Sequence, residues 1–428
     1  MQPRYGFSVQ RNGIPSTRFS ADLHETSWYL APSPRRTVAV NASGPPSLTV
    51  TAMCRVVGFL GPISNSKGSL FTGCHSAPAY IRFFFVMLST GLDRVATTCE
   101  AIRAMSSLVS LEDIQAAARA IRGIARVTPL VEISQPHQPR VLVKCENLQL
   151  GGAFKIRGAT NMVSRLDGSA RRRGLITYSS GNHGRAVAIA SCLAGIRAVV
   201  VMPTTAPPIK VDAVRSLGAE VIFEGTTSSE RKIRAEKEAE SRGLTMVPPF
   251  DHEWIVAGQG TIGLEVLEQC DDLEEIYVPI GGGGLISGVA AAIKAVKPAV
   301  RIAGVEPAGA ARMTASLTAG HPVTLSGSAS IADGLLPVRP GDLTFAHVRA
   351  HVDAVVTVDD DEIASTVGWL FREAKLVAEP SGAAALAALR SAPRDRRGGA
   401  CVAVISGGNV AAADLLALID QRSLRARQ

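Results

Sequence analysis

The lysine at position 155 has the type and the setting best suited to covalent chemistry in this chain. It follows the aromatic ring of Phe154 and precedes a segment of helical character that contains Gly158. A lysine amine attacks an aldehyde only when it is deprotonated, and a desolvated site lowers its pKa toward that condition. The segment therefore predicts a carbonyl-binding lysine, although a solvated lysine on a helix surface would be the usual interpretation of this residue alone.

Four successive glycines at residues 281–284 could bind an anion. They follow an apolar run that ends at Ile280 and precede a segment of helical character that begins at Leu285. Backbone N–H groups without side chains can converge on a phosphate, and the N-terminus of the following helix adds a partial positive charge. The same pattern could bind a nucleotide or merely connect a strand to a helix, and such glycine patterns are weak evidence alone.

Two short polar loops carry further candidates. Residues 179–184 read Ser-Ser-Gly-Asn-His-Gly, and residues 406–409 read Ser-Gly-Gly-Asn. Ser and Asn in such turns often only cap the next helix. His183 could be a general base or a metal ligand, but no Cys, His, Asp or Glu accompanies it at ligand spacing. We therefore expect a packed or hydrogen-bonded histidine and no metal site.

In their order along the chain, these four segments resemble the threonine/serine dehydratase branch of the fold type II pyridoxal-phosphate enzymes, a branch that also includes serine racemases. The resemblance extends from about Ser110 to about Asp420. Flanking segments agree with it, namely residues 144–149, 257–262 and 304–307. A chance match of a single motif would not reproduce this order.

The resemblance implies that pyridoxal 5'-phosphate is the cofactor. It also implies that Lys155 binds the cofactor aldehyde, that Asn182 hydrogen-bonds the ring hydroxyl and that Ser406 pairs with the pyridine nitrogen. The implied cofactor-binding residues are Phe154, Lys155, Asn182, Gly281, Gly282, Gly283, Gly284, Leu285 and Ser406. The implied substrate-binding residues around the substrate carboxylate are Ser179, Ser180, Asn182 and His183.

The implied reaction is a β-elimination by an ammonia-lyase. L-Threonine or L-serine would yield 2-oxobutyrate or pyruvate and ammonia, with Lys155 as the catalytic base that removes the Cα proton. The neutral hydroxyl of Ser406 favours elimination over transamination, because it does not force the pyridine nitrogen to be protonated. Ser180, the second catalytic candidate, could instead reprotonate the carbanion from the opposite face, which would make the enzyme a serine or amino-acid racemase.

Other reactions stay open. Arg185 stands where many relatives have Gln, and its charge could favour an acidic substrate such as hydroxyaspartate, although the side chain could equally point to solvent. A synthase that replaces the β-substituent is a further alternative. A non-catalytic cofactor-binding protein is another, against which Lys155 argues. Arg312 stands in a stretch where cation-binding relatives place a carboxylate, so we expect little response to magnesium.

The elements that must position these residues alternate along the chain. Helical stretches separate short β-branched runs at residues 175–178, 198–202, 220–223, 275–278, 355–358 and 401–405. This alternation predicts an α/β fold with parallel sheets covered on both faces, and ligands at the carboxyl ends of the strands. The glycine motifs fall at those ends.

The resemblance implies two domains, each with a parallel-rich twisted sheet flanked by helices, and a cofactor in the cleft between them. The large cofactor-binding domain would comprise residues 105–173 and 249–428, and the small domain residues 174–248. The resemblance further implies a homodimer or a higher homo-oligomer.

Residues 1–104 match no part of the family and show no steady periodicity. A misassigned start, a targeting peptide and a disordered extension are the alternatives, and we expect a misassigned start, with Met105 as the natural start. The first expected helix follows a capping-box spacing between Ser110 and Asp113. Its apolar residues recur on one helical face, namely Ile114, Ala117, Ala118, Ile121 and Ile124.

Composition narrows the class of protein. Residues 1–104 hold ten Lys or Arg and four Asp or Glu, and hence +6 of the net charge of +8 over 428 residues. The enzyme-like part is therefore nearly neutral, which argues against a nucleic-acid partner. No apolar run reaches the ~18 residues of a membrane span. Seven cysteines without a CxxC pair favour reduced thiols in a cytoplasmic protein. The family resemblance implies a small-molecule amino acid as the substrate.

Overall fold

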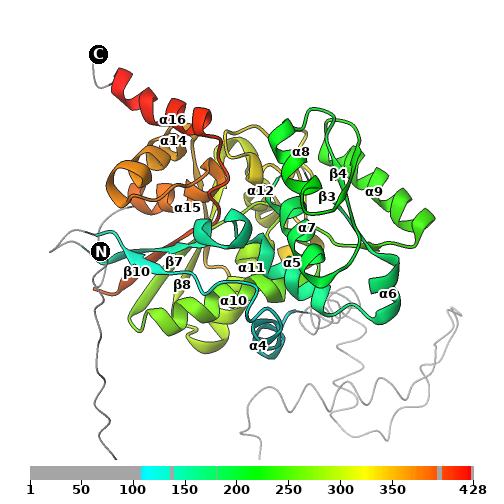
Figure 1. Cartoon of the computed structure of the whole chain (residues 1–428). Coiled ribbons are helices and arrows are strands. Elements are labelled where there is room, and N and C mark those ends of the chain that lie inside the picture. Colours follow the sequence, from blue (N-terminus) through cyan, green and yellow to red (C-terminus); the bar gives the residue numbers. More distant parts are fainter. Residues whose placement is uncertain (1–107, 135–138, 180, 393–397, 426–428) are drawn as a thin grey trace, which may run out of the picture. The chain divides into compact units, whose positions relative to one another are not determined.

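The computed structural model describes residues 108–134, 139–179, 181–392 and 398–425. The extension at residues 1–104, the expected start at Met105 and the candidate Ser180 lie outside these residues. Within the described ranges, strands and helices alternate along the chain, as Figure 1 shows.

The larger of two sheets has six strands in the order β1-β2-β10-β7-β8-β9. Its strands are β1 (Leu130–Glu132), β2 (Val141–Cys145), β7 (Leu273–Pro279), β8 (Arg301–Pro307), β9 (Ala354–Val358) and β10 (Ala400–Ile405). β1 pairs antiparallel with β2, and the other four pairings are parallel. The parallel-rich sheet confirms the predicted α/β class.

The second sheet has four strands in the order β5-β4-β3-β6. Its strands are β3 (Leu175–Tyr178), β4 (Ala198–Met202), β5 (Glu220–Phe223) and β6 (Thr245–Met246). All three pairings are parallel. The sheet lies within the segment predicted to be the small domain.

Helices pack on both faces of the large sheet, and β10 shows why. All six residues of this strand are buried. Cys401, Ala403 and Ile405 join an apolar cluster with α15 (Pro380–Ser391). Val402 and Val404 point to the other face and join a cluster with α11 (Gly284–Val296). A strand covered on both faces has no polar side, which explains the continuous apolar run at residues 400–405.

The remaining elements connect and cover these strands. The other α-helices are α4 (Leu111–Ala120), α5 (Lys155–Ser164), α6 (Gly168–Arg173), α7 (Asn182–Ala194), α8 (Pro208–Arg215), α9 (Ser228–Arg242), α10 (Glu253–Gln269), α12 (Arg312–Ala319), α13 (Asp342–His351), α14 (Asp360–Trp369) and α16 (Ala412–Arg425). Short helical turns are η1 (Glu146–Leu148), η2 (Leu150–Gly152), η3 (Ala308–Ala310), η4 (Asp333–Leu335) and the π-turn η5 (Leu370–Ala374). Among the described helices, none has both the length and the apolar content to span a membrane.

The first described helix begins as the sequence predicts. The Ser110 side chain accepts from the Asp113 backbone, and the Asp113 side chain accepts from the Ser110 backbone. Ile114, Ala117 and Ile121 are buried. α4 ends at Ala120, so the periodic apolar pattern extends beyond the helix itself.

Candidate active site

Lys155 is the first residue of α5, directly after Phe154. Its side chain is half-buried, and Nζ donates a 2.7 Å hydrogen bond to the Pro249 carbonyl. Nζ also lies 5.0 Å from the centre of the Phe154 ring. Burial lowers the pKa of Lys155 from its ordinary value to about 8, because a charged ammonium loses hydration there. The structure thus supplies the desolvation that a nucleophilic lysine requires.

The segment that leads into Lys155 is tied to the loop after β10. The Phe154 N–H donates to the Ser406 carbonyl at 3.1 Å. Ala153 and Gly407 form an isolated antiparallel bridge. Ser406 itself is buried, and its hydroxyl donates to the Ser381 carbonyl at 3.4 Å. Lys155 and Ser406, which are far apart in sequence, therefore belong to the same site.

The four glycines form a tight turn between β7 and α11, as the sequence predicts. A Cβ at Gly282 would overlap the Phe250 ring, and Gly283 has a φ of +99° that few other residues adopt. Gly284 and Leu285 are the first residues of α11 and are buried. The loop thus combines close backbone packing with the N-terminus of a 13-residue helix, the arrangement that suits a phosphate.

Arg312 holds this glycine loop from one side. Its guanidinium is fully buried and donates to the Ile280 carbonyl and, at 2.9 Å, to the Gly281 carbonyl. The same group donates to Leu335 at 2.6 Å and lies 3.6 Å from the Glu306 carboxylate. From the sequence, Arg312 was considered only as a residue that would disfavour a bound metal cation. Its contacts with the two loop carbonyls could not be predicted, because they leave no recognisable pattern in the neighbouring sequence.

The loop after β3 places Ser179 and His183 beside the same region. Ser179 Oγ accepts from the Gly181 N–H at 3.2 Å. His183 is buried, and its Nε2 donates to the Val247 carbonyl at 3.1 Å. Burial and, secondly, the charge of Lys155 lower the pKa of His183 to about 3, so the ring is neutral near pH 7. This confirms the predicted packed histidine, and its substrate contact stays a prediction.

Asn182 contacts a carboxyl group to which sequence reasoning assigned no role. Its Nδ2 donates to Glu379 Oε1 at 2.6 Å. Burial, and then the charge of Asp333, raise the pKa of Glu379 to about 8. Only the fold shows that Glu379 lies against Asn182.

One segment that the sequence did not single out joins these parts. Residues 247–250 connect β6 to α10. Val247 accepts from His183, Pro249 accepts from Lys155, and Phe250 packs against Gly282 and Gly284. The segment therefore brings together the lysine, the loop after β3 and the glycine loop.

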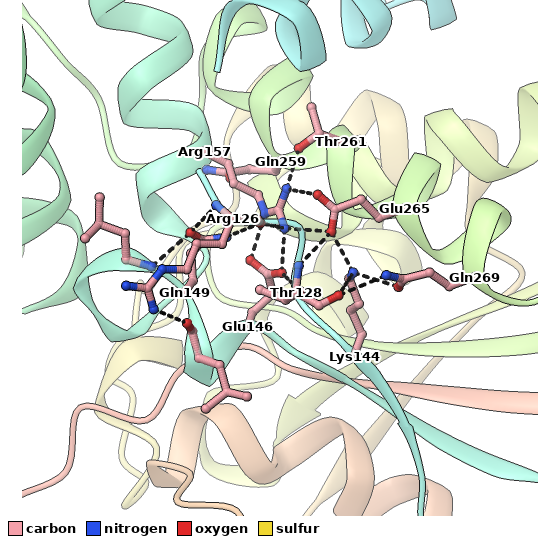
Figure 2. A network of polar contacts seen from close by, with 12 residues as sticks. Arg126, Thr128, Lys144, Glu146, Gln149, Arg157, Gln259, Thr261, Glu265 and Gln269 are labelled. Carbon is pink, nitrogen blue, oxygen red and sulfur yellow. Dashed lines mark hydrogen bonds and ion pairs between the residues drawn. The ribbon is translucent and has the colours of Figure 1, made fainter. Parts of the chain in front are cut away.

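A buried charge network fixes the helix that begins at Lys155. Arg157 lies two residues further along α5, and its side chain is 1% exposed. Figure 2 shows its guanidinium between two carboxylates. It donates to both oxygens of Glu146 at 2.8 Å and to the oxygens of Glu265 at 2.6 and 2.9 Å. Arg157 thereby joins α5 to η1 and α10.

Lys144 completes the network from β2. Its Nζ donates to Glu265 Oε2 at 2.6 Å and to the Thr128 carbonyl at 2.7 Å. The two cations and two carboxylates of the network balance in charge, which is the condition for burying them together. Elsewhere among the described residues, no group of three or more His, Cys, Asp or Glu could hold a metal ion.

Residues 121–407 match a family model described as "Pyridoxal-phosphate dependent enzyme". The chain is 42% identical over 306 residues to the L-threonine ammonia-lyase of Thermotoga maritima, and the match covers 71% of this chain and 76% of that relative. It is 42% identical over 291 residues to the biosynthetic L-threonine dehydratase of Escherichia coli, and this match covers 67% of the chain but only 57% of the relative. Among solved structures, maize serine racemase superimposes with a TM-score of 0.68 at 35% identity, covering 75% of this chain and 99% of that one.

Proposed function

The chain belongs to the pyridoxal-phosphate dependent enzyme family, and from this premise we propose that it is a threonine/serine dehydratase. It would convert L-threonine or L-serine by β-elimination into 2-oxobutyrate or pyruvate and ammonia. The similarity to the L-threonine ammonia-lyase of Thermotoga maritima supports this reaction. The observation that carries it is the convergence of a desolvated Lys155, a glycine loop at a helix N-terminus and a neutral Ser406 in one site.

The residues of the site fit pyridoxal 5'-phosphate. The glycine loop would hold the phosphate, because its backbone, packed closely against Phe250, leads directly into the N-terminus of α11. Lys155 would hold the aldehyde, and Ser406 would face the pyridine nitrogen. When bound, the cofactor supplies a carbonyl that condenses with amines and a ring that withdraws electrons from the substrate Cα.

Lys155 is the proposed base that removes the Cα proton of the substrate. With a pKa of about 8, about a tenth of the free amines are deprotonated at pH 7. The Pro249 carbonyl, 2.7 Å from Nζ, orients this amine. In the proposed reaction Nζ accepts the Cα proton as a general base. Ser406 offers the ring nitrogen a neutral hydroxyl and not a carboxylate, so this nitrogen need not be protonated. This favours loss of the β-hydroxyl over transamination.

A paired assay tests this function. Formation of 2-oxo acid and loss of optical purity would be followed together for L-threonine, L-serine and L-threo-3-hydroxyaspartate. Lys155→Ala should lower 2-oxo acid formation by about a hundred- to ten-thousandfold. The matched control is Lys232→Ala on α9, whose side chain is 56% exposed and should leave the rate unchanged. A wild-type protein that releases no 2-oxo acid from any of the three substrates would contradict the proposal.

Racemisation is the second candidate, because the chain also resembles maize serine racemase. In that case Ser180, which lies outside the described residues, would supply the second acid/base group. The same assay separates the two reactions. Racemisation faster than elimination, and lost in Ser180→Ala, would favour the racemase.

We further infer a cytoplasmic homodimer or higher homo-oligomer, as the family resemblance implies. The described cysteines Cys145, Cys192 and Cys270 are free thiols, which suits a reducing compartment. Light scattering coupled to size exclusion would test the oligomeric state. A monomer at micromolar concentration would contradict it.

A further inference from the structure

Four polar side chains from three separate segments form a chain of hydrogen bonds at the candidate site. Arg185, in the first turn of α7, donates from Nη1 to Asn409 Oδ1 at 3.0 Å. Asn409, which follows β10, donates from Nδ2 to Asn182 Oδ1 at 2.8 Å. Asn182 in turn donates from Nδ2 to Glu379 Oε1 at 2.6 Å. Arg185 therefore does not point freely into solvent, and its side chain is half-buried.

The arginine sets the direction of this chain. A guanidinium has donors and no acceptor, so the oxygen of the Asn409 carboxamide must face it. The Asn409 nitrogen then faces Asn182, and the Asn182 nitrogen faces Glu379. The orientation of both amides thus follows from the chemistry of Arg185, even though the two ends of an amide look alike in shape.

Asn409 has a second contact that fixes the same orientation. Its Nδ2 also donates to the Gly151 carbonyl at 2.8 Å. A Cβ at Gly152 would overlap the Asn409 carboxamide, so the amide is packed directly against η2. The Gly408 N–H donates to the Gly152 carbonyl at 2.9 Å. The chain is thereby anchored to the segment that leads into Lys155.

Glu379 ends the chain and accepts in either protonation state. It is 6% exposed, and its backbone N–H donates to the Gly407 carbonyl at 3.1 Å. The charged groups that act on it are Asp333, which raises its pKa, and, with a smaller effect, Lys210, which lowers it. A carboxyl oxygen accepts the Asn182 hydrogen whether or not the group is ionised. Nδ2 of Asn182 carries a second hydrogen, for which the described residues provide no acceptor.

We propose that Arg185 is a positioning residue that, through Asn409, aims this second N–H of Asn182 at the ring oxygen of the bound cofactor. The role rests on the proposed function, since it takes pyridoxal 5'-phosphate as the ligand of Asn182. Arg185 acts through hydrogen-bond polarity and does not itself contact the substrate. A glutamine at position 185 could present either its nitrogen or its oxygen to Asn409, so the polarity would then rest on the Gly151 carbonyl alone among the described contacts of Asn409.

The experiment titrates the full-length apo-protein with pyridoxal 5'-phosphate and records the dissociation constant and the ratio of the two main absorption bands of the bound cofactor. Arg185→Met keeps much of the side-chain length but removes the donor. It should raise the Kd about tenfold, which corresponds to about 1.4 kcal/mol, and change the band ratio. Arg185→Lys is the matched control, because lysine is also a donor without an acceptor, and it should stay within about threefold of wild type.

Two results would overturn the proposal. The first is an Arg185→Met protein with the affinity and spectrum of wild type. The second is an Arg185→Lys protein as impaired as Arg185→Met. If Arg185→Met fails to fold, as judged by circular dichroism, Arg185→Leu takes its place, because it also removes the donor, with an expected loss of more than about threefold. Wild-type affinity in that variant would again overturn the role.

A parallel assay of wild-type 2-oxo acid formation separates this role from the proposed function. Cofactor binding with the predicted effect of Arg185→Met, but without conversion of any hydroxy amino acid, would uphold the positioning role and refute only the dehydratase. Absence of cofactor binding to the wild-type protein would refute both.

Discussion

Replacement of Arg157 by Met should cost far more stability than the same replacement of Arg140. Both arginines contact two carboxylates. Arg157 bonds Glu146 and Glu265 with a side chain that is 1% exposed. Arg140 bonds Glu132 at 3.0 Å and Asp272 at 2.6 Å, but its side chain is 42% exposed. The pair of variants therefore compares the same change at two levels of burial.

The magnitude follows from what each arginine leaves behind. Without Arg157, the fully buried Glu146 keeps only the Thr128 hydroxyl as a described partner, at 2.5 Å. Removing one member of a buried ion pair costs about 3–5 kcal/mol, because the remaining buried charge loses its directly bonded partner. Lys144 still acts on Glu146 through its charge but is not hydrogen-bonded to it in the described contacts. Without Arg140, two half-exposed carboxylates return to water, and the loss is about 0–1 kcal/mol.

The penalty should also depend on pH. Burial by itself raises the pKa of Glu146, and Arg157 is the main group that lowers it. In Arg157→Met the folded state would hold a proton on Glu146 that the unfolded state releases above its ordinary pKa of ~4.3. The variant should therefore lose stability as pH rises from about 5 to 8, relative to wild type.

Urea unfolding of the apo-proteins, followed by circular dichroism at pH 5.5 and 8, measures both effects. The midpoint of Arg157→Met should fall clearly below that of Arg140→Met, and the gap should widen at pH 8. Equal midpoints for the two variants would refute the reasoning that burial sets the cost. A gap that narrows at pH 8 would refute the proposed protonation of Glu146.

Three further predictions concern the cofactor site. Burial holds the pKa of Glu379 near 8, above its ordinary value of 4.5. Between these two pH values the folded state therefore binds one proton more than the unfolded state, and the wild-type protein should lose stability as the pH rises from about 4.5 to 8. Glu379→Gln should flatten that slope in the melting temperature of the apo-protein, and parallel slopes would contradict the assignment. Gly282→Ala should weaken cofactor binding at least tenfold, because its Cβ overlaps Phe250, whereas Gly327→Ala meets open space and should not; equal cofactor affinity in a titration would contradict this. Because the fully buried Arg312 already supplies a cation beside the glycine loop, magnesium or a chelator should leave the reaction rate unchanged, and activation that a chelator abolishes would show this to be wrong.

Much of the strand pattern could be predicted from the sequence. The runs at residues 175–178, 198–202 and 220–223 coincide with β3, β4 and β5. Strands that are buried on both faces, such as β4, appear as apolar runs. β1, β2, β6 and β8 were missed, and β8 begins with the exposed Arg301 and includes Gly304 and Glu306. Gly304 lets Ile280 approach the strand, a tertiary contact that no local pattern reports.

The candidate site likewise has a part that could be predicted from the sequence and a part that could not. Lys155, the glycine loop and Ser406 could be predicted because their chemistry resides in residue types that follow recognisable strand ends. The contacts that join them could not, since 94 residues separate Lys155 from Pro249 and 197 separate Asn182 from Glu379. Such contacts depend on how parallel strands are ordered in the sheets, and that order is not local information.

Arg185 shows where this limit matters for function. From the sequence, Arg185 could be either a surface charge or a contact for an acidic substrate. Both interpretations consider only the charge of the guanidinium. In the fold its Nη1 donates to Asn409, so the property that matters is that the guanidinium cannot accept a hydrogen bond. A lysine would share this property, whereas a methionine has no donor at all. The comparison of Arg185→Lys with Arg185→Met therefore tests the donor character of this side chain while the Gly151 contact of Asn409 stays in place.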